Sequence, residues 1–272
     1  MSFNSMIVFL LVFVFNALHA QQNIMYNNWD KEILTDQDTL RYSSFTIIRD
    51  SIKFDSLNTI HSVDVFKNGK CVFGTDLGAR QRYNCHMGLS PILNNGKEQL
   101  IIEIYWDGME CYYYWVLNLS DSVEVLYDSH RFPDCELADI TAFADIDHDG
   151  TLEFIQRVDG DIFAIFKYSK ADNAFVFSNP KFSKLCDTYI SDRKEDLEVF
   201  LKSNNQRQDL DYHDEIVSQI TSIVIQYALS NKEQKGWEYF DKVYRQSDKQ
   251  IILYNIQQEL ANSELFKKLH AH

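Results

Sequence analysis

Basic side chains are scarce in this chain of 272 residues, which carries 26 lysines and arginines against 40 aspartates and glutamates, for a formal net charge of −14. Binding nucleic acid requires a basic surface that displaces counterions, so the composition argues against such a partner. It also argues against docking on an anionic membrane face. Proline (3) and glycine (9) are rare, which excludes collagen and low-complexity linkers. Hydrophobic residues make up 45%, enough for a large core.

Catalytic signatures are missing as well. The sequence has no GxSxG elbow, no HExxH zinc motif, no P-loop and no GxGxxG fingerprint. It has no CxxC pair, so neither a zinc knuckle nor a thioredoxin-type site is supported. Carboxylates are numerous, but nothing selects one pair for acid–base chemistry. We therefore assign no catalytic residue.

The amino-terminal segment contains an unbroken apolar run of ten residues, Met6 to Phe15. A membrane-spanning helix needs about 20 such residues. A shorter run that ends in Ala-Leu-His-Ala is typical of a secretory signal peptide cleaved after Ala20. We therefore expect residues 1–20 to be removed and the mature chain to be exported to the periplasm or the exterior, without stable membrane insertion. The alternative is a buried N-terminal strand.

Five cysteines follow, and export permits disulfides. An odd number leaves one thiol over unless it pairs between chains. The near-neighbour pairings are Cys71 with Cys85 and Cys111 with Cys135. The spacing alone does not decide between these and pairings that include Cys186.

Residues 21–186 have the pattern of a β-rich domain. Asn68-Gly69 and Asp159-Gly160 each separate two runs rich in β-formers, and such dipeptides predict hairpins because both residues tolerate positive φ. Further strands are expected at 100–106, 111–118 and 123–127. The aromatic cluster Tyr112–Trp115 fits a sheet with both faces partly covered. A sugar or peptide platform is the alternative.

Residues 187–272 have a helical period instead. We expect a helix capped by Asp192, with Glu195 at its third position, and another that begins at the capping box Ser247–Gln250. A short last helix is expected at about 263–269. Apolar residues between these helices recur three, four and seven apart, which predicts buried helical faces; they are Ile216, Ile220, Ile223, Val224 and Tyr227, then Trp237, Phe240 and Tyr244. The fold class expected is α+β: an antiparallel β-meander or propeller-like domain followed by a helical region.

One motif suggests a binding site. Aspartates occupy alternate positions 145, 147 and 149, and Gly150, Thr151 and Glu153 follow. Calcium prefers six to eight oxygen ligands, and alternate acids on a tight turn can surround it. We predict one calcium ion bound by the carboxylates of Asp145, Asp147, Asp149 and Glu153 and by the carbonyl of Thr151. Without a cation these acids would repel one another, so an empty loop should be mobile.

The loop differs from an EF-hand, which needs a bidentate acid at position twelve, where this chain has Gln156. The flanking segments 140–143 and 152–155 have strand character and not helix character. We therefore expect a β–loop–β arrangement. The alternative is an acidic hairpin turn that binds no metal.

The motif resembles the calcium loop of FG-GAP or VCBS-type β repeats, as in integrin-like propeller blades. Residues 95–101 match 149–155 as a degenerate copy, in which Pro91 and Leu93 replace the first two aspartates, so this copy should not bind calcium. The wider order of motifs is similar to a group of exported bacterial proteins largely without assigned function. The resemblance implies repeated β-blades, although one good and one eroded copy are too few to predict a closed propeller.

Three functions remain open. The first is an exported, non-catalytic module with a binding or structural role, stiffened by calcium, whose partner is an unidentified protein or glycan. The second is an inhibitor or immunity-type protein of a peptidase or cell-wall hydrolase, because an acidic surface complements a basic enzyme. The third is an unrecognised hydrolase. We favour the first, and neither Tyr212–Glu215 nor His270-Ala-His272 indicates a catalytic or metal site strongly enough to change this.

Overall fold

The computed structural model describes the greater part of the chain. The described residues are 34, 37–53, 59–75, 83–106, 111–132, 137–158, 162–204 and 209–271. The expected signal peptide (1–20), Gln21, and the turn residues Asp159 and Gly160 lie outside them.

Three antiparallel sheets of four strands each form the first part of the fold. The first contains β1 (Thr39–Tyr42), β2 (Phe45–Lys53), β3 (Thr59–Lys67) and β4 (Lys70–Gly74). The second contains β5 (Tyr83–Ser90), β6 (Gln99–Trp106), β7 (Cys111–Leu119) and β8 (Val123–Asp128). The third contains β9 (Leu137–Ala144), β10 (Glu153–Val158), β11 (Phe163–Ser169) and β12 (Ala174–Phe177). In each sheet the strands follow one another in chain order, so each is a meander.

Helices form the second part. The long helices are α2 (Ser183–Ser203), α3 (Leu210–Leu229), α4 (Glu233–Val243) and α5 (Lys249–Asn262), and α6 (Glu264–His270) is short. Two 3-10 turns, η2 (Ser129–Arg131) and η4 (Asn179–Phe182), follow the second and third sheets. The expected α+β class, with a β part before a helical part, is confirmed. None of the helices within the described ranges combines the length and apolarity required to cross a membrane.

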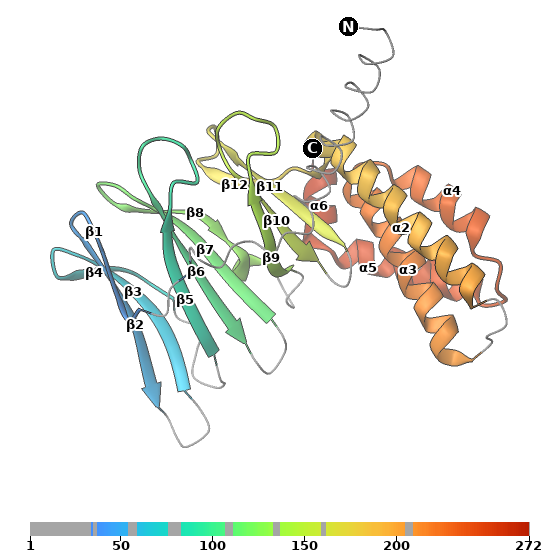
Figure 1. Ribbon diagram of the computed structural model, residues 1–272, viewed down its shortest axis with the longest axis horizontal. Helices are drawn as coiled ribbons and strands as arrows, with labels where there is room; N and C mark the ends of the chain where they lie inside the picture. Colours follow the sequence, from blue (N-terminus) through green and yellow to red (C-terminus); the bar gives the residue numbers. More distant parts are fainter. Residues whose placement is uncertain are drawn as a thin grey trace, which may run out of the picture.

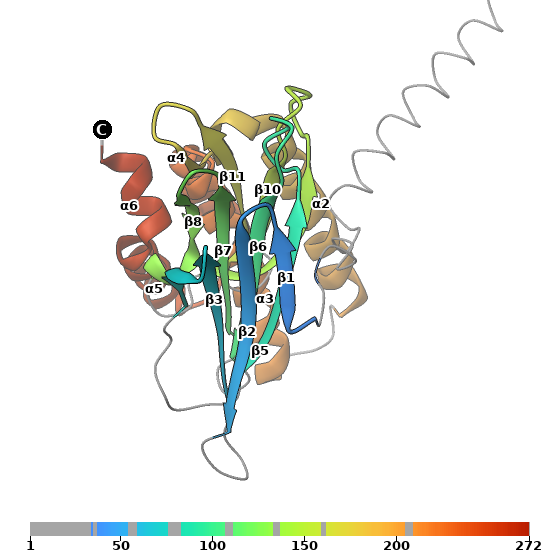
Figure 2. The same cartoon turned by 90° about the vertical axis from the view of Figure 1, so that its left-hand side faces the viewer.

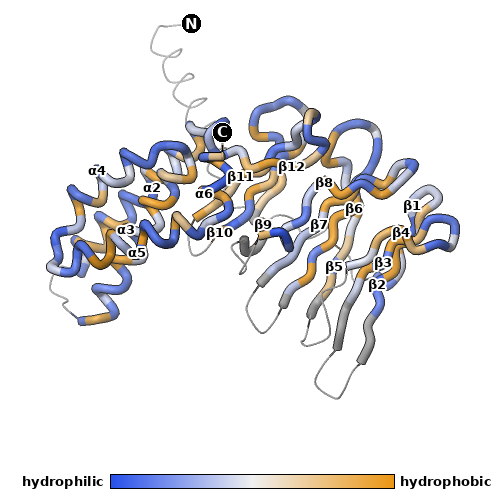
Figure 3. Tube along the Cα trace, turned by 180° about the vertical axis from the view of Figure 1, so that it is seen from behind, coloured by the Kyte–Doolittle hydropathy of each residue, from blue (hydrophilic) through white to orange (hydrophobic). Residues whose placement is uncertain are grey.

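The three sheets stand side by side like blades, and the helices cover the outer side of the third (Figure 1). Seen from the end, the first sheet lies in front of the other two (Figure 2). The described sheets form an open stack and not a closed propeller. Within the sheets the hydrophobic segments lie along the strands, whereas the coloured loops at the upper ends of the strands are mostly hydrophilic (Figure 3).

The second sheet is buried on both faces. Trp115 and Leu117 pack with Ile47 and Val65 of the first sheet, whereas Tyr114 and Val116 belong to the core shared with the third sheet and the helices. A strand covered on both faces needs a continuous apolar run, and residues 112–117 supply one. The expectation of a two-sided sheet is confirmed here.

One expected helix start is wrong, and the other lies in the predicted capping box but without the predicted cap. The predicted cap Asp192 lies in the middle of α2, because the preceding 3-10 turn, with Pro180 in its first turn, starts the helical segment nine residues earlier, at Ser183. The second helix, α5, begins at Lys249, inside the predicted box Ser247–Gln250, but its N-cap residue is Asp248 and not Ser247. Asp248 does not cap it with its side chain, because that carboxylate accepts hydrogen bonds from Tyr244 and contacts His213.

Three cysteines, Cys71, Cys85 and Cys186, are free thiols. Cys71 is exposed, whereas Cys85 and Cys186 are buried, so the near-neighbour pairing of Cys71 with Cys85 is not formed. Burial raises the pKa of Cys85 to about 12 and that of Cys186 to about 11, which makes both poor nucleophiles. The side chain of Cys111 and the whole of Cys135 lie outside what is described.

Candidate metal centre

The acidic loop connects β9 to β10 at one end of the third sheet. These strands pair antiparallel, with Ala144 opposite Glu153 and Phe143 opposite Phe154. The loop is therefore flanked by strands, as expected from the sequence, and the helix–loop–helix geometry of an EF-hand is absent from this part of the chain.

Left-handed backbone positions make the loop tight. His148 (φ +60°) and Gly150 (φ +87°) both adopt this conformation, which allows the chain to reverse within a few residues. The Gly150 amide donates to Asp145 Oδ2 over 3.0 Å, and the Thr151 amide donates to Asp149 Oδ1 over 2.8 Å. The bend predicted at Gly150 is confirmed, whereas the left-handed His148 was not anticipated.

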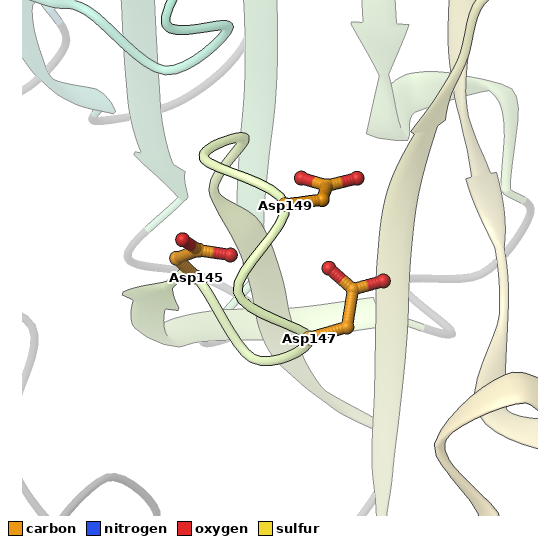
Figure 4. A group of neighbouring side chains, drawn as sticks. All are labelled: Asp145, Asp147 and Asp149. Carbon is orange, nitrogen blue, oxygen red and sulfur yellow. The ribbon is translucent and has the colours of Figure 1, made fainter.

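The three aspartates converge as the sequence predicts. One carboxylate oxygen from each of Asp145, Asp147 and Asp149 lies within 4.8 Å of the others, and this triad could hold a metal ion (Figure 4). Asp147 and Asp149 are 39% and 46% exposed, so the centre is open to solvent on their side. Asp145 is half-buried, and its Oδ1 atom is buried without a hydrogen-bond partner.

The other two predicted ligands, Glu153 and Thr151, are placed differently relative to the loop. Glu153 is completely buried at the start of β10, where its Oε2 accepts from the Ile146 amide over 2.8 Å. This hydrogen bond holds the Glu153 carboxylate against the backbone of the loop. Thr151 contributes the amide that binds Asp149, and no contact places its carbonyl at the centre.

A residue that sequence reasoning missed stands among these acids. The Nζ atom of Lys167, on β11, lies 2.8 Å from Asp147 Oδ2, 2.7 Å from Asp149 Oδ2 and 2.7 Å from Glu153 Oε1. The prediction that an ion-free loop would be mobile did not take this internal cation into account. With it, the repulsion among three of the four acids is offset inside the protein.

These contacts shift the pKa values of the groups involved. The hydrogen bond from Lys167 is the largest cause that lowers the pKa of Asp149. Burial raises the pKa of Glu153, although hydrogen bonds from Lys167 and the Ile146 amide oppose this. Burial alone would lower the pKa of Lys167, but its three carboxylate partners outweigh burial and raise that pKa. The Lys167 side chain is therefore protonated and carries a positive charge.

Lys167 nevertheless neither neutralises all four acids nor donates a hydrogen bond to each of them. An ammonium group has three N–H donors, and here three carboxylates use all of them. Asp145 Oδ1 remains without a partner, and a buried polar atom left unpaired costs about 1–3 kcal/mol. Four carboxyl groups also face a single ammonium. Hard oxygen donors with excess negative charge fit a divalent cation such as calcium.

The degenerate copy forms a second loop of the same shape between β5 and β6. The Lys97 amide donates to Asn95 Oδ1 over 3.0 Å, as Thr151 does to Asp149, and Gly96 has φ +75°. Gln99 is fully buried and its Oε1 accepts from the Leu93 amide over 3.0 Å, as Glu153 does from Ile146. Among the described residues, only the 145–149 triad forms a metal-type cluster.

The position of Lys167 is also changed in that copy. Gln99 pairs with Asn118 on β7. In the third sheet Phe154 pairs with Phe166, so the next residues outward, Glu153 and Lys167, face each other in the same way. The ionic pair of one loop is thus replaced by two amides in the other.

The two loops touch. The Leu152 amide donates to the Ile92 carbonyl over 2.9 Å. A Cβ atom added to Gly150 would lie 2.5 Å from Asn94 Nδ2, so the glycine also permits this close approach. The candidate metal centre is therefore part of the contact between the second and third sheets.

Two cavities lie elsewhere. One of about 420 Å³ separates α3 from α5, and one of about 540 Å³ lies between β8, β12 and α6. Neither is lined by residues 145–153.

The histidines considered from the sequence do not form a metal cluster. His213 Nε2 lies 3.0 Å from Asp248 Oδ2 and 3.0 Å from Tyr244, so it joins the start of α3 to the start of α5. His270 Nδ1 lies 2.9 Å from the Phe266 carbonyl of its own helix, and His272 is outside the described residues.

Comparison with known proteins adds no family to these observations: no family model, no curated protein and no solved structure matches the chain.

Proposed function

We propose that this chain is an exported, non-catalytic module of the FG-GAP or VCBS type, in which one calcium ion at the 145–153 loop joins adjacent β-blades. The supporting observation is the buried, unpartnered Oδ1 atom of Asp145 beside the converging carboxylates of Asp147 and Asp149. Calcium supplies positive charge that six to eight oxygens can share, whereas the three donors of Lys167 cannot reach all four acids.

The position of the loop supports a structural role for the ion. The loop contacts the degenerate copy through Leu152 and Gly150, so an ion that fixes its backbone also fixes this contact between sheets. The two cavities described above are not lined by the loop, which favours a binding or structural role over calcium-assisted hydrolysis.

Thermal unfolding in calcium and in a chelator tests the proposal. A ligand that binds only the folded state at 100 times its Kd stabilises that state by about 2.7 kcal/mol. For a domain of this size we expect the melting temperature to rise by roughly 5–10 °C in calcium. Asp145→Asn keeps an oxygen for the Gly150 amide but removes the charge, and it should abolish most of this rise.

The control is Asp121→Asn, which removes an equal charge from an exposed turn outside the loop. It should retain the full response to calcium. Equal melting temperatures with and without chelator in the unsubstituted chain would refute the calcium site. Export is tested separately, by the N-terminal residue of the mature chain, which we expect to be Gln21.

A further inference from the structure

The ammonium group of Lys167 already supplies a positive charge to the candidate metal centre. Lys167 Nζ lies 2.7–2.8 Å from oxygens of Asp147, Asp149 and Glu153. Calcium binds carboxylate oxygens at about 2.3–2.6 Å, so an ion held by the same acids would have to stand close to the place of this ammonium. Two cations at such a separation repel strongly, so they cannot share the centre.

We propose that Lys167 is a tethered counter-cation that stabilises the ion-free loop and is displaced when calcium binds, so that competition with Lys167 sets the calcium affinity. This inference rests on the proposed calcium site. The flexible four-carbon stem of lysine makes such an exchange feasible without backbone movement. The Lys167 side chain is 17% exposed and its partner Asp147 is 39% exposed, so this side of the centre borders solvent.

The number of N–H donors on Lys167 explains why calcium should displace the lysine and not the reverse. In the lysine-bound state all three donors are used and Asp145 Oδ1 has no partner. An ion with six to eight ligands can satisfy that atom together with the other acids. The lysine-bound state is therefore an adequate resting state but an incomplete one, and calcium at sufficient concentration should replace it.

The degenerate loop supports a role for Lys167 that depends on the acids. Where Glu153 becomes Gln99, the residue across the sheet becomes Asn118. Gln99 is satisfied locally, since its Oε1 accepts from Leu93 and its Nε2 donates to the Lys97 carbonyl. The strand pairing thus forms without a lysine at this position, and a lysine stands across the sheet only from the loop that has acids to neutralise.

Competition predicts weak binding by the unsubstituted chain and tighter binding once the lysine is removed. We expect a Kd on the order of 10⁻⁴–10⁻³ M, the range of extracellular calcium modules. Lys167→Met keeps an unbranched four-atom stem and removes the ammonium group with its charge. It should lower the Kd by roughly 10- to 100-fold, equivalent to about 1.4–2.8 kcal/mol.

Calorimetric titration of the full chain with calcium chloride measures this change. Lys170→Met, which removes the same charge from an exposed position three residues further on, is the matched control and should change the Kd less than about threefold, because exposed charges are screened. Lys167→Gln provides a second neutral variant if Lys167→Met does not fold. In chelator, either Lys167 variant should melt below the unsubstituted chain, and saturating calcium should remove or reverse that difference.

The outcomes separate the two proposals. If Lys167→Met and the unsubstituted chain bind calcium with equal Kd, the site exists but the exchange is refuted. If neither binds calcium and Lys167→Met only loses stability, Lys167 replaces the ion permanently, and the calcium site and the exchange are both refuted. Tightening in Lys167→Met beyond that in Lys170→Met supports the exchange.

Discussion

The contact between the two loops can be tested with a pair of equivalent glycines. Gly150 and Gly96 occupy the same position in the acidic loop and in its degenerate copy, with φ values of +87° and +75°. An alanine at either position must adopt a left-handed conformation, which costs about 1–2 kcal/mol. Only at Gly150 would the added Cβ also meet another group, Asn94 Nδ2 at 2.5 Å, whereas nothing lies within 4 Å at Gly96.

The two substitutions should therefore differ in a predictable way. We expect Gly96→Ala to lower the free energy of unfolding by about 1–2 kcal/mol, through backbone strain alone. Gly150→Ala should lose up to about 1 kcal/mol more, roughly the cost of an unfavourable rotamer, because the exposed Asn94 side chain must turn away. Urea unfolding in chelator measures both values without a contribution from calcium.

A rescue experiment separates strain from the clash. Asn94 itself has φ +46°, so Asn94→Gly removes the side chain without new backbone strain. In the Gly150→Ala background it should recover the excess loss and leave the strain. Equal losses for Gly150→Ala and Gly96→Ala, or no recovery with Asn94→Gly, would refute the close approach of the loops.

Two further predictions concern polar groups away from the loop. Tyr114 donates to the buried carboxylate of Glu103 over 2.5 Å, so Tyr114→Phe should lower the free energy of unfolding by about 1–3 kcal/mol in urea titrations; a loss near zero would contradict this. The hydrogen bond from Tyr244, with a smaller effect of His213, lowers the pKa of Asp248 below its ordinary 3.8, so its contribution to stability is present above about pH 4 and is lost as pH falls through the lowered value. Asp248→Asn should therefore destabilise the chain at pH 7 and progressively less as pH falls below about 4, and a deficit independent of pH would contradict the linkage.

Local sequence patterns predicted the elements whose geometry depends on near neighbours. Asn68 and Gly69 adopt the positive φ values that their hairpin requires, +52° and +79°. The alternate acids and the glycine after them produced a tight loop between strands, with three aspartates converging. The faces of α3 were predicted because its apolar spacing follows the helical period, and Ile216, Ile220, Ile223 and Val224 are all buried.

Lys167 was not predictable in the same way, because its place depends on the length of a turn. A two-residue turn at Asp159-Gly160 would place Phe166, and not Lys167, opposite Glu153. The observed pairing is shifted by one residue, since the Val158 amide donates to the Ile162 carbonyl over 2.8 Å. A shift of one residue moves every side chain of a strand to the other face, so the internal cation appears only when the register is known.

The stacking of the three sheets also could not be predicted from local sequence patterns. Only one eroded copy of the loop marks a second blade, and the first sheet has no such motif. Its membership in the stack depends on Ile47, Val63 and Val65 packing on the second sheet, a contact between segments distant in sequence.

The most direct test of the proposed metal centre is a calorimetric titration of the metal-free chain with calcium chloride. We predict binding of one ion per chain in the submillimolar to millimolar range, on the order expected for extracellular modules, and its loss in Asp145→Asn. Absence of any binding up to about 10 mM, well above that range, would contradict the calcium site. Binding that Asp145→Asn leaves unchanged would place calcium elsewhere in the protein.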